Sequence, residues 1–142
     1  MSRKIREVLG AMTPFPHHID WDAKAGEASR LMNDLEIRHL PVVSGTRIVG
    51  LLSRRELDVA ALLGGLMESL SVKDLCVTQP YVVDASERLD NVVEQMSERR
   101  IGSAIVVRDD KLIGILTTTD VCRILAETLR EGHAPSGGDE AA

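Results

Sequence analysis

Residues 37–57 read IRHLPVVSGTRIVGLLSRREL, and residues 101–121 read IGSAIVVRDDKLIGILTTTDV. Each stretch holds two apolar runs separated by a short polar loop, a pattern that predicts a β-hairpin. A Ser or Thr then follows the second run, with an acidic residue three positions later, which predicts the start of a helix. The two stretches lie 64 positions apart, so the same hairpin–helix unit is predicted twice.

The repeat extends beyond these two stretches. Residues 8–57 align with residues 72–121 without a gap, and nine positions are identical: Val8/Val72, Pro16/Pro80, Asp20/Asp84, Met32/Met96, Ile37/Ile101, Val42/Val106, Val43/Val107, Gly50/Gly114 and Leu52/Leu116. A tandem repeat predicts two copies of one supersecondary unit, each with an apolar face that the other can cover. Clefts along the pseudo-two-fold axis of such a pair are natural ligand sites.

Each copy is predicted to contain the series β-α-β-β-α after a short leading segment. The first copy is predicted as a leading helix over 4–12, a strand over 17–20, a helix over 24–35, strands over 39–43 and 47–52, and a helix over 53–63. The second copy is predicted as a leading segment over 67–75, a strand over 81–84, a helix over 89–99, strands over 103–107 and 111–116, and a helix over 119–129. These predictions rest on proline positions, apolar spacing and hairpin-length loops.

The predicted fold class is therefore α/β (α+β), with two tandem repeats packed about a pseudo-two-fold axis. The first repeat takes residues 1–64 with its leading helix, and the second takes residues 65–130. Residues 131–142 have no apolar period and predict a disordered tail. A chain of 142 residues suits one domain-sized core, so the repeats are expected to fold as one intramolecular pair.

Composition narrows the classes of function. The net charge of −5 and an aromatic content of 2% argue against nucleic-acid binding, which requires basic surface or stacking platforms. The sequence has no apolar run of membrane-spanning length and no signal-peptide core at its start, so a soluble, cytoplasmic protein without membrane contact is expected. The two cysteines, Cys76 and Cys122, are not repeat equivalents and are expected to be reduced.

The motifs together resemble a cystathionine-β-synthase (CBS) domain, found twice. The resemblance is carried by residues 12–16, 37–43 and 50–57 in the first copy and by residues 80–83, 101–107 and 114–121 in the second. It covers roughly residues 5–128 and leaves no room for a separate catalytic domain. It implies adenosine-containing ligands in clefts between the copies, and dimerisation of the pair through the repeat helices into a flat disk.

The nucleotide-binding pattern of that family is Gly, two residues, Ser or Thr, two residues, Asp, and it is matched by Gly114, Thr117 and Asp120. An Asp in the first turn of a helix can accept hydrogen bonds from both hydroxyls of a ribose. Free N–H groups at the helix start, with Thr117 and Thr118 hydroxyls, can meet phosphate oxygens. The alternative is structural: Thr117 or Thr118 caps the helix, and the negative charge of Asp120 stabilises the positive N-terminal end of the helix dipole.

The first copy departs from the pattern, because Glu56 stands where the pattern has Asp. The longer side chain displaces the carboxylate, so a ribose fitted to Asp is not held in the same way. Ser53 and Glu56 therefore predict a weaker or empty second site, in which Glu56 serves as the capping-box partner of Ser53.

A second asymmetry lies before the second strand of each copy. Gly102 and Ser103 are small enough for close approach of a ligand ring, whereas Arg38 and His39 in the first copy could reach phosphates across the pseudo-axis. The alternative for Arg38 and His39 is an exposed Arg and a half-buried His at a strand start. The ligand-binding set implied by the resemblance is Asp120, Thr117, Thr118, Gly102, Ser103, Pro80, Val82, Arg38 and His39.

The function that these observations favour is a regulatory sensor for AMP, ADP, ATP or S-adenosylmethionine, with no required cofactor. Its partners would be that small molecule, a second copy of the chain and a regulated protein. The alternative is a ligand-independent dimerisation or protein-interaction module. No enzyme is predicted, because no convincing acid–base pair or nucleophile elbow occurs. No metal site is predicted either, because the adjacent His17 and His18 would point to opposite faces of a strand.

Overall fold

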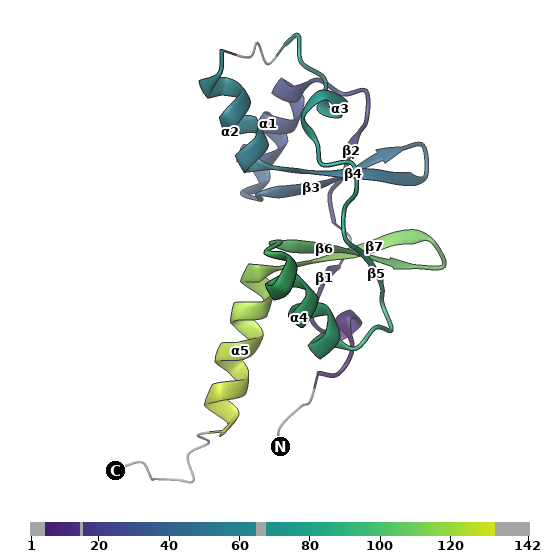
Figure 1. The fold of residues 1–142 in the computed structure, drawn as a ribbon, viewed down its shortest axis with the longest axis vertical. Coiled ribbons are helices and arrows are strands. Elements are labelled where there is room, and N and C mark those ends of the chain that lie inside the picture. The colour runs from purple at the N-terminus through teal and green to yellow at the C-terminus, as the bar shows by residue number, and fades with distance from the viewer. Residues whose placement is uncertain (1–4, 15, 65–67, 133–142) are drawn as a thin grey trace.

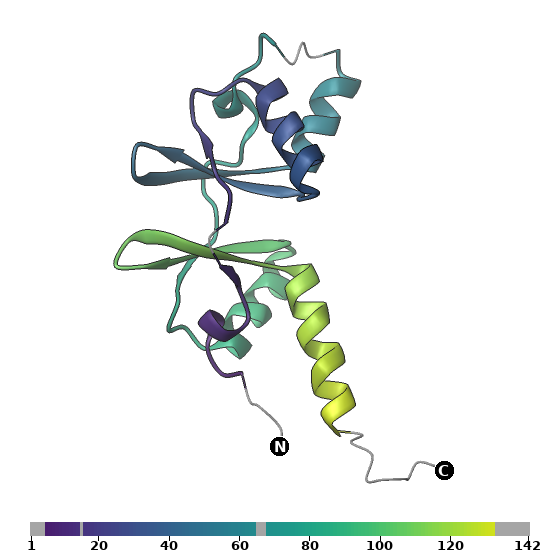
Figure 2. The same cartoon turned by 180° about the vertical axis from the view of Figure 1, so that it is seen from behind.

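The computed structural model describes residues 5–14, 16–64 and 68–132. Two β-sheets lie face to face across the middle of the molecule, and helices cover their outer faces (Figure 1 and Figure 2). One sheet has three strands and the other has four. The mixed α/β fold with two repeats about a pseudo-two-fold axis is thereby confirmed.

The elements follow the predicted order twice. The first copy contains β2 (Ile19–Asp20), α1 (Ala25–Leu35), β3 (His39–Ser44), β4 (Arg47–Ser53) and α2 (Arg54–Leu62). The second contains β5 (Val82–Asp84), α4 (Leu89–Arg99), β6 (Ser103–Arg108), β7 (Lys111–Thr117) and α5 (Thr118–Gly132). The leading segments contribute η1 (Val8–Gly10), β1 (Thr13–Pro14) and α3 (Val72–Leu75). Helix α5 is longer than predicted and extends away from the sheets in both views.

The two sheets share their pairing pattern. In the first, β3 pairs antiparallel with β4 and parallel with β2. In the second, β6 pairs antiparallel with β7 and parallel with β5. Both hairpins shift register at the same place, between Val42 and Val43 and between Val106 and Val107. The two copies thus share not only their strand pairing but also the position of this register shift.

The first leading segment packs on the opposite copy, which the sequence did not reveal. Val8 is fully buried in the second apolar core, beside Val92 and Leu116, and β1 adds a fourth strand to the second sheet by pairing with β7. The predicted helix over 4–12 is wrong for the described part of that range. Only Val8–Gly10 forms a helical turn, because the chain must straighten into β1 to reach β7.

The second leading segment mirrors the first. Val72 is fully buried in the first core, with Leu40 and Leu57. The main chain is held in the same way on both sides: the Val8 N–H donates to the Glu87 carbonyl at 3.0 Å, and the Val72 N–H donates to the Ala23 carbonyl at 2.8 Å. Each half of the fold therefore contains a piece of the other half's sequence.

Two equivalent glycines permit this crossing. A Cβ on Gly114 would lie 2.9 Å from the carbonyl oxygen of Thr13 and would also collide with Met12. A Cβ on Gly50 would lie 2.8 Å from the carbonyl oxygen of Val77. Any side chain at these positions would push the crossing segment off the sheet. The glycine that opens the family pattern thus has a packing role.

The final predicted segment, residues 131–142, lies mostly outside the described residues, which end within α5 at Gly132. Among the helices that the structure describes, none combines the length and the apolar character that crossing a bilayer requires.

Candidate ligand-binding clefts

Two clefts lie between the copies, and the pseudo-two-fold axis relates one to the other. The Asp120 cleft has a volume of about 630 Å³. It is lined by Thr13, Pro14, Pro16, His17, Glu36, Ile37, Arg38, His39, Ile115, Thr117, Thr118, Thr119 and Asp120. It therefore combines the start of α5 with residues of the first copy.

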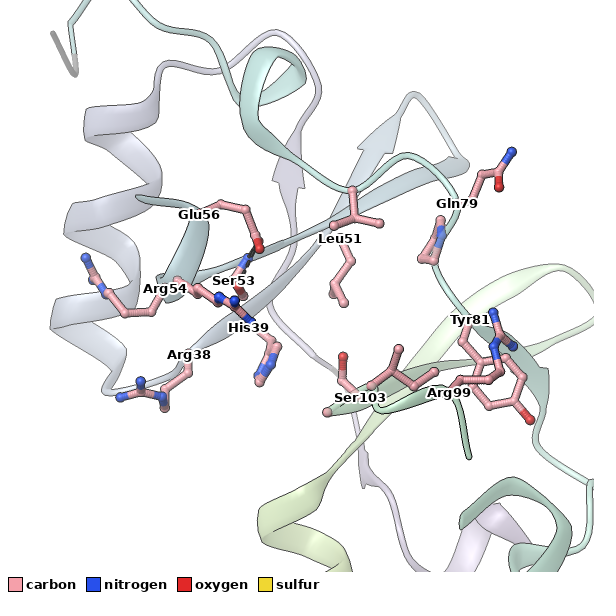
Figure 3. A pocket seen from close by; sticks show the side chains of 15 residues that line it. Arg38, His39, Leu51, Ser53, Arg54, Glu56, Gln79, Tyr81, Arg99 and Ser103 are labelled. Atoms are coloured by element: carbon pink, nitrogen blue, oxygen red, sulfur yellow. Dashed lines mark hydrogen bonds between the residues drawn. The ribbon is translucent and has the colours of Figure 1, made fainter. Parts of the chain in front are cut away.

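The Glu56 cleft is smaller, at about 330 Å³. It is lined by Arg38, His39, Leu51, Ser53, Arg54, Arg55, Glu56, Val77, Gln79, Pro80, Tyr81, Arg99, Ile101, Gly102 and Ser103 (Figure 3). Eleven of its fifteen lining residues are the repeat equivalents of residues in the Asp120 cleft. The start of α2 takes the place of the start of α5.

The structure divides the predicted ligand-binding set between these clefts. Thr117 and Thr118 lie with Asp120. Pro80, Gly102 and Ser103 lie instead with Ser53 and Glu56, in the other cleft. Arg38 and His39 line both clefts. Val82, an exposed residue of β5, lines neither of these two clefts. The residues predicted to form a single site therefore belong to two different clefts, and each cleft is lined by residues of both copies.

Asp120 is buried at the start of α5, and both of its carboxylate oxygens are engaged. Oδ2 accepts from the Thr117 N–H at 2.9 Å and from the Thr117 hydroxyl at 3.2 Å. Oδ1 accepts from the Thr13 hydroxyl at 3.0 Å and from Arg123 Nη2 at 3.3 Å. A carboxylate offers about four acceptor positions, and all four are occupied, so a ribose that donates both hydroxyls to Asp120 must displace two of these donors.

Glu56 forms the capping box that the sequence predicts. Its Oε1 accepts from the Ser53 N–H and from the Ser53 hydroxyl, both at 2.7 Å. The acid and the hydroxyl at the start of α2 thus satisfy each other. In contrast to Asp120, Glu56 forms no hydrogen bond with a described residue of the crossing segment, where Val77 stands in place of Thr13.

Arg38 and His39 sit beside the pseudo-axis. His39 is half-buried, and burial lowers the pKa of its imidazole, while Glu56 acts in the opposite direction. Gly102 faces His39, whose Nε2 would be 3.9 Å from a Cβ at that glycine. Arg38 is exposed. The asymmetry between Arg38-His39 and Gly102-Ser103 therefore places titratable and cationic groups on one side of the axis.

Arg54 stands beside Arg38 in the Glu56 cleft, but its guanidinium is committed elsewhere. It donates to the Ser29 hydroxyl and carbonyl at 3.2 Å, and to Asn33 Oδ1 at 2.7 Å. Arg54 therefore fastens α2 to α1 and is not free to neutralise a ligand. Across the described residues, no group of three or more His, Cys, Asp or Glu side chains could hold a metal ion.

The first-copy wall of the Asp120 cleft was not predicted from the sequence. Thr13, Pro16, His17 and Ile37 lie there, facing residues of the second copy. The signal that could have found them is the repeat itself. If the clefts lie between copies, the acid of one copy must face the proline that precedes the first strand of the other copy.

Comparison with known proteins establishes the family. The sequence model described as the CBS domain matches residues 5–61 and again residues 72–127. These matches cover most of the chain, so the protein belongs to the CBS domain family and contains the domain twice.

Similar proteins share this architecture. The Vibrio cholerae protein AcuB is 29% identical, with a TM-score of 0.78 over 91% of this chain and 98% of that chain. CBSX2, solved in complex with AMP, is 28% identical, with a TM-score of 0.73 over 87% of this chain and 98% of that chain. Homoserine O-acetyltransferase of Methanohalobium evestigatum is 30% identical over 71% of this chain, but the chain spans only 20% of that enzyme.

Proposed function

We propose that the protein is a cytoplasmic regulatory module that binds an adenine nucleotide or an adenosyl ligand such as S-adenosylmethionine in the Asp120 cleft. It would act by changing its shape or its association rather than by catalysis, and it would need no cofactor. A ligand can drive such a change only through its differential affinity for two states of the protein. The observation that carries the proposal is a buried carboxylate at a helix start, facing a cleft of about 630 Å³.

The geometry of this cleft suits a nucleoside monophosphate. Its volume lies well within the range of about 300–1,000 Å³ typical of small-molecule sites. The start of α5 offers N–H groups and threonine hydroxyls for a phosphate. The similar protein CBSX2 has been crystallised with AMP, which supports an adenosine ligand here.

The hydrogen bonds on Asp120 indicate how a ligand would enter. Arg123 is half-exposed, with a side-chain exposure of 49%, and exposed ion pairs contribute little. The Thr13 hydroxyl can rotate toward another acceptor. A ribose diol could therefore replace these two donors on Oδ1 while the Thr117 bonds on Oδ2 keep the helix capped.

A thermal-shift and calorimetric titration tests the proposal. Protein shown to be free of ligand is titrated with AMP, ADP, ATP and S-adenosylmethionine. At a concentration about 100 times its dissociation constant, the bound ligand should add about 2.7 kcal/mol to the free energy of unfolding. No shift with any of the four compounds would contradict the proposal and favour the ligand-independent interaction module.

We also expect the chain to form a homodimer through its outer helices. Apolar side chains are exposed on α2 at Val59 and Leu62, and on α5 at Leu125 and Leu129. Both views place α2 and α5 on the same side of the molecule (Figure 1 and Figure 2). Exposed apolar surface of this kind marks interaction sites.

Light scattering during size-exclusion chromatography checks the dimer. The wild-type protein should have twice the chain mass of 15.5 kDa, and the double variant Leu125→Glu, Leu129→Glu should have the chain mass. Val82→Glu, an exposed position on β5, serves as the control and should remain dimeric. A monomeric wild-type protein would remove the dimer from the proposal.

A further inference from the structure

The Glu56 cleft differs from its symmetry mate in charge. Arginines line it at Arg38, Arg54, Arg55 and Arg99, against a single carboxylate, Glu56. At the equivalents of Arg54 and Arg55 the Asp120 cleft has threonines. A cleft lined by charges of one sign focuses their field and attracts ions of the opposite sign.

Three of these arginines are available to a ligand. The side chains of Arg38 and Arg55 are exposed and form no hydrogen bond or ion pair with any described residue. Arg99 lies over the ring of Tyr81, with its Cζ 4.7 Å from the ring centre. Stacking holds the guanidinium in place but leaves its in-plane N–H donors free. In Figure 3, Tyr81 and Arg99 stand across the cleft from Arg38 and His39.

A buried hydroxyl supplies the second observation. Ser103 is 4% exposed, and its hydroxyl forms no hydrogen bond with any residue that the structure describes. Figure 3 shows this side chain directed into the cleft, on the side facing His39. Buried polar groups nearly always have a partner, because an unpaired one loses its bonds to water without compensation. The missing partner of Ser103 is therefore expected to be an atom of a ligand.

The chemistry of that ligand follows from the surrounding groups. The carboxylate of Glu56 accepts both Ser53 donors on Oε1. The volume of about 330 Å³ lies at the lower end of the small-molecule range. Arginine forks match phosphate oxygens, which they bind through two parallel hydrogen bonds.

We propose that the Glu56 cleft binds an oligophosphate group, with Ser103 and Arg99 donating to its oxygens and Arg38 and Arg55 offsetting its charge. This deepens the proposed function, because it assigns a second class of ligand to the second cleft of the same pair. It does not depend on Asp120. The shared chemistry is a chain of phosphates, either free or as the tail of a nucleotide.

Calorimetry with pyrophosphate, tripolyphosphate and adenosine at low salt tests the proposal. Tripolyphosphate should bind, and Arg99→Gln should weaken it about tenfold, the size of a lost charge-assisted hydrogen bond. Ser103→Ala should weaken it about two- to tenfold. Arg47→Gln, which removes an equal charge from the exposed start of β4 outside both clefts, should change the affinity less than twofold.

The outcomes separate this proposal from the proposed function. If AMP binds and neither phosphate does, the oligophosphate site is excluded while the sensor proposal stands. If tripolyphosphate binds and no adenosine compound does, the oligophosphate site stands and the sensor proposal is excluded. If Arg47→Gln and Arg99→Gln weaken tripolyphosphate binding equally, the anion is held by diffuse charge attraction, and the proposed site is overturned. In the Asp120→Asn protein, ATP binding more tightly than tripolyphosphate would assign the site to a nucleotide tail, and equal affinity would assign it to the free anion.

Discussion

Replacing Asp120 with alanine should weaken AMP binding about 10- to 150-fold. Hydrogen bonds between a carboxylate and two hydroxyls are charge-assisted and contribute about 1.5–3 kcal/mol, which corresponds to this range. The measurement is calorimetry on the folded protein. Because Asp120 also accepts from the N–H and the hydroxyl of Thr117, the variant should lose about 0.5–2 kcal/mol of stability as well.

Two further variants separate the binding role of Asp120 from its capping role. Asp120→Asn keeps an oxygen that can accept from Thr117 but loses the charge. Compared with Asp120→Ala, it should therefore regain more of the wild-type stability than of the wild-type AMP affinity. Glu56→Ala removes the matched acid and the matched cap from the start of α2, and it should leave AMP affinity within about twofold. Unchanged affinity in Asp120→Ala would take this carboxylate out of the site.

Replacing Gly114 with alanine should lower the free energy of unfolding by about 1–3 kcal/mol, the usual cost of overpacking. The new Cβ would lie 2.9 Å from the Thr13 carbonyl oxygen, and a main-chain atom cannot move aside as a side chain can. Strand β1 should separate from β7, which would also displace Thr13 and Pro14 from the Asp120 cleft. Urea unfolding measures the stability loss.

The glycines of this chain provide their own controls. Gly50→Ala should cost a similar amount, because its Cβ would lie 2.8 Å from the Val77 carbonyl oxygen. Gly132→Ala, at the end of α5 with no heavy atom within 4 Å of its Cβ, should be neutral or slightly stabilising. A Gly114→Ala protein as stable as Gly132→Ala would refute the packing role of the crossing segment.

The regular elements could be predicted because their signals are local. Helix α4 spans Leu89–Arg99 as expected from its apolar spacing, and the capping box of Ser53 and Glu56 forms as its sequence pattern indicates. The C-terminal ends of α1 and α4 also lie where the apolar spacing predicts them, although no glycine marks them. Glu36 and Arg100 follow these helices with φ values of 55° and 54°, a left-handed conformation that glycine adopts most readily.

The partners of the leading segments could not be predicted, for a reason that lies in the repeat itself. Val8 and Val72 have equivalent positions, so local sequence does not say which of two similar cores each one joins. The same ambiguity affects the clefts. The spacing of Gly114, Thr117 and Asp120 places them at one helix start but does not say which copy forms the opposite wall.

The exchange of leading segments makes the two repeats mutually dependent. A repeat produced by itself would lack the valine that closes its interior, Val72 for the first and Val8 for the second. It would have to fill that position with the valine of its own leading segment or with one from another molecule. Loss of order in one half must therefore open the interior of the other, and the chain should melt as a unit even though its sequence looks divisible at the midpoint.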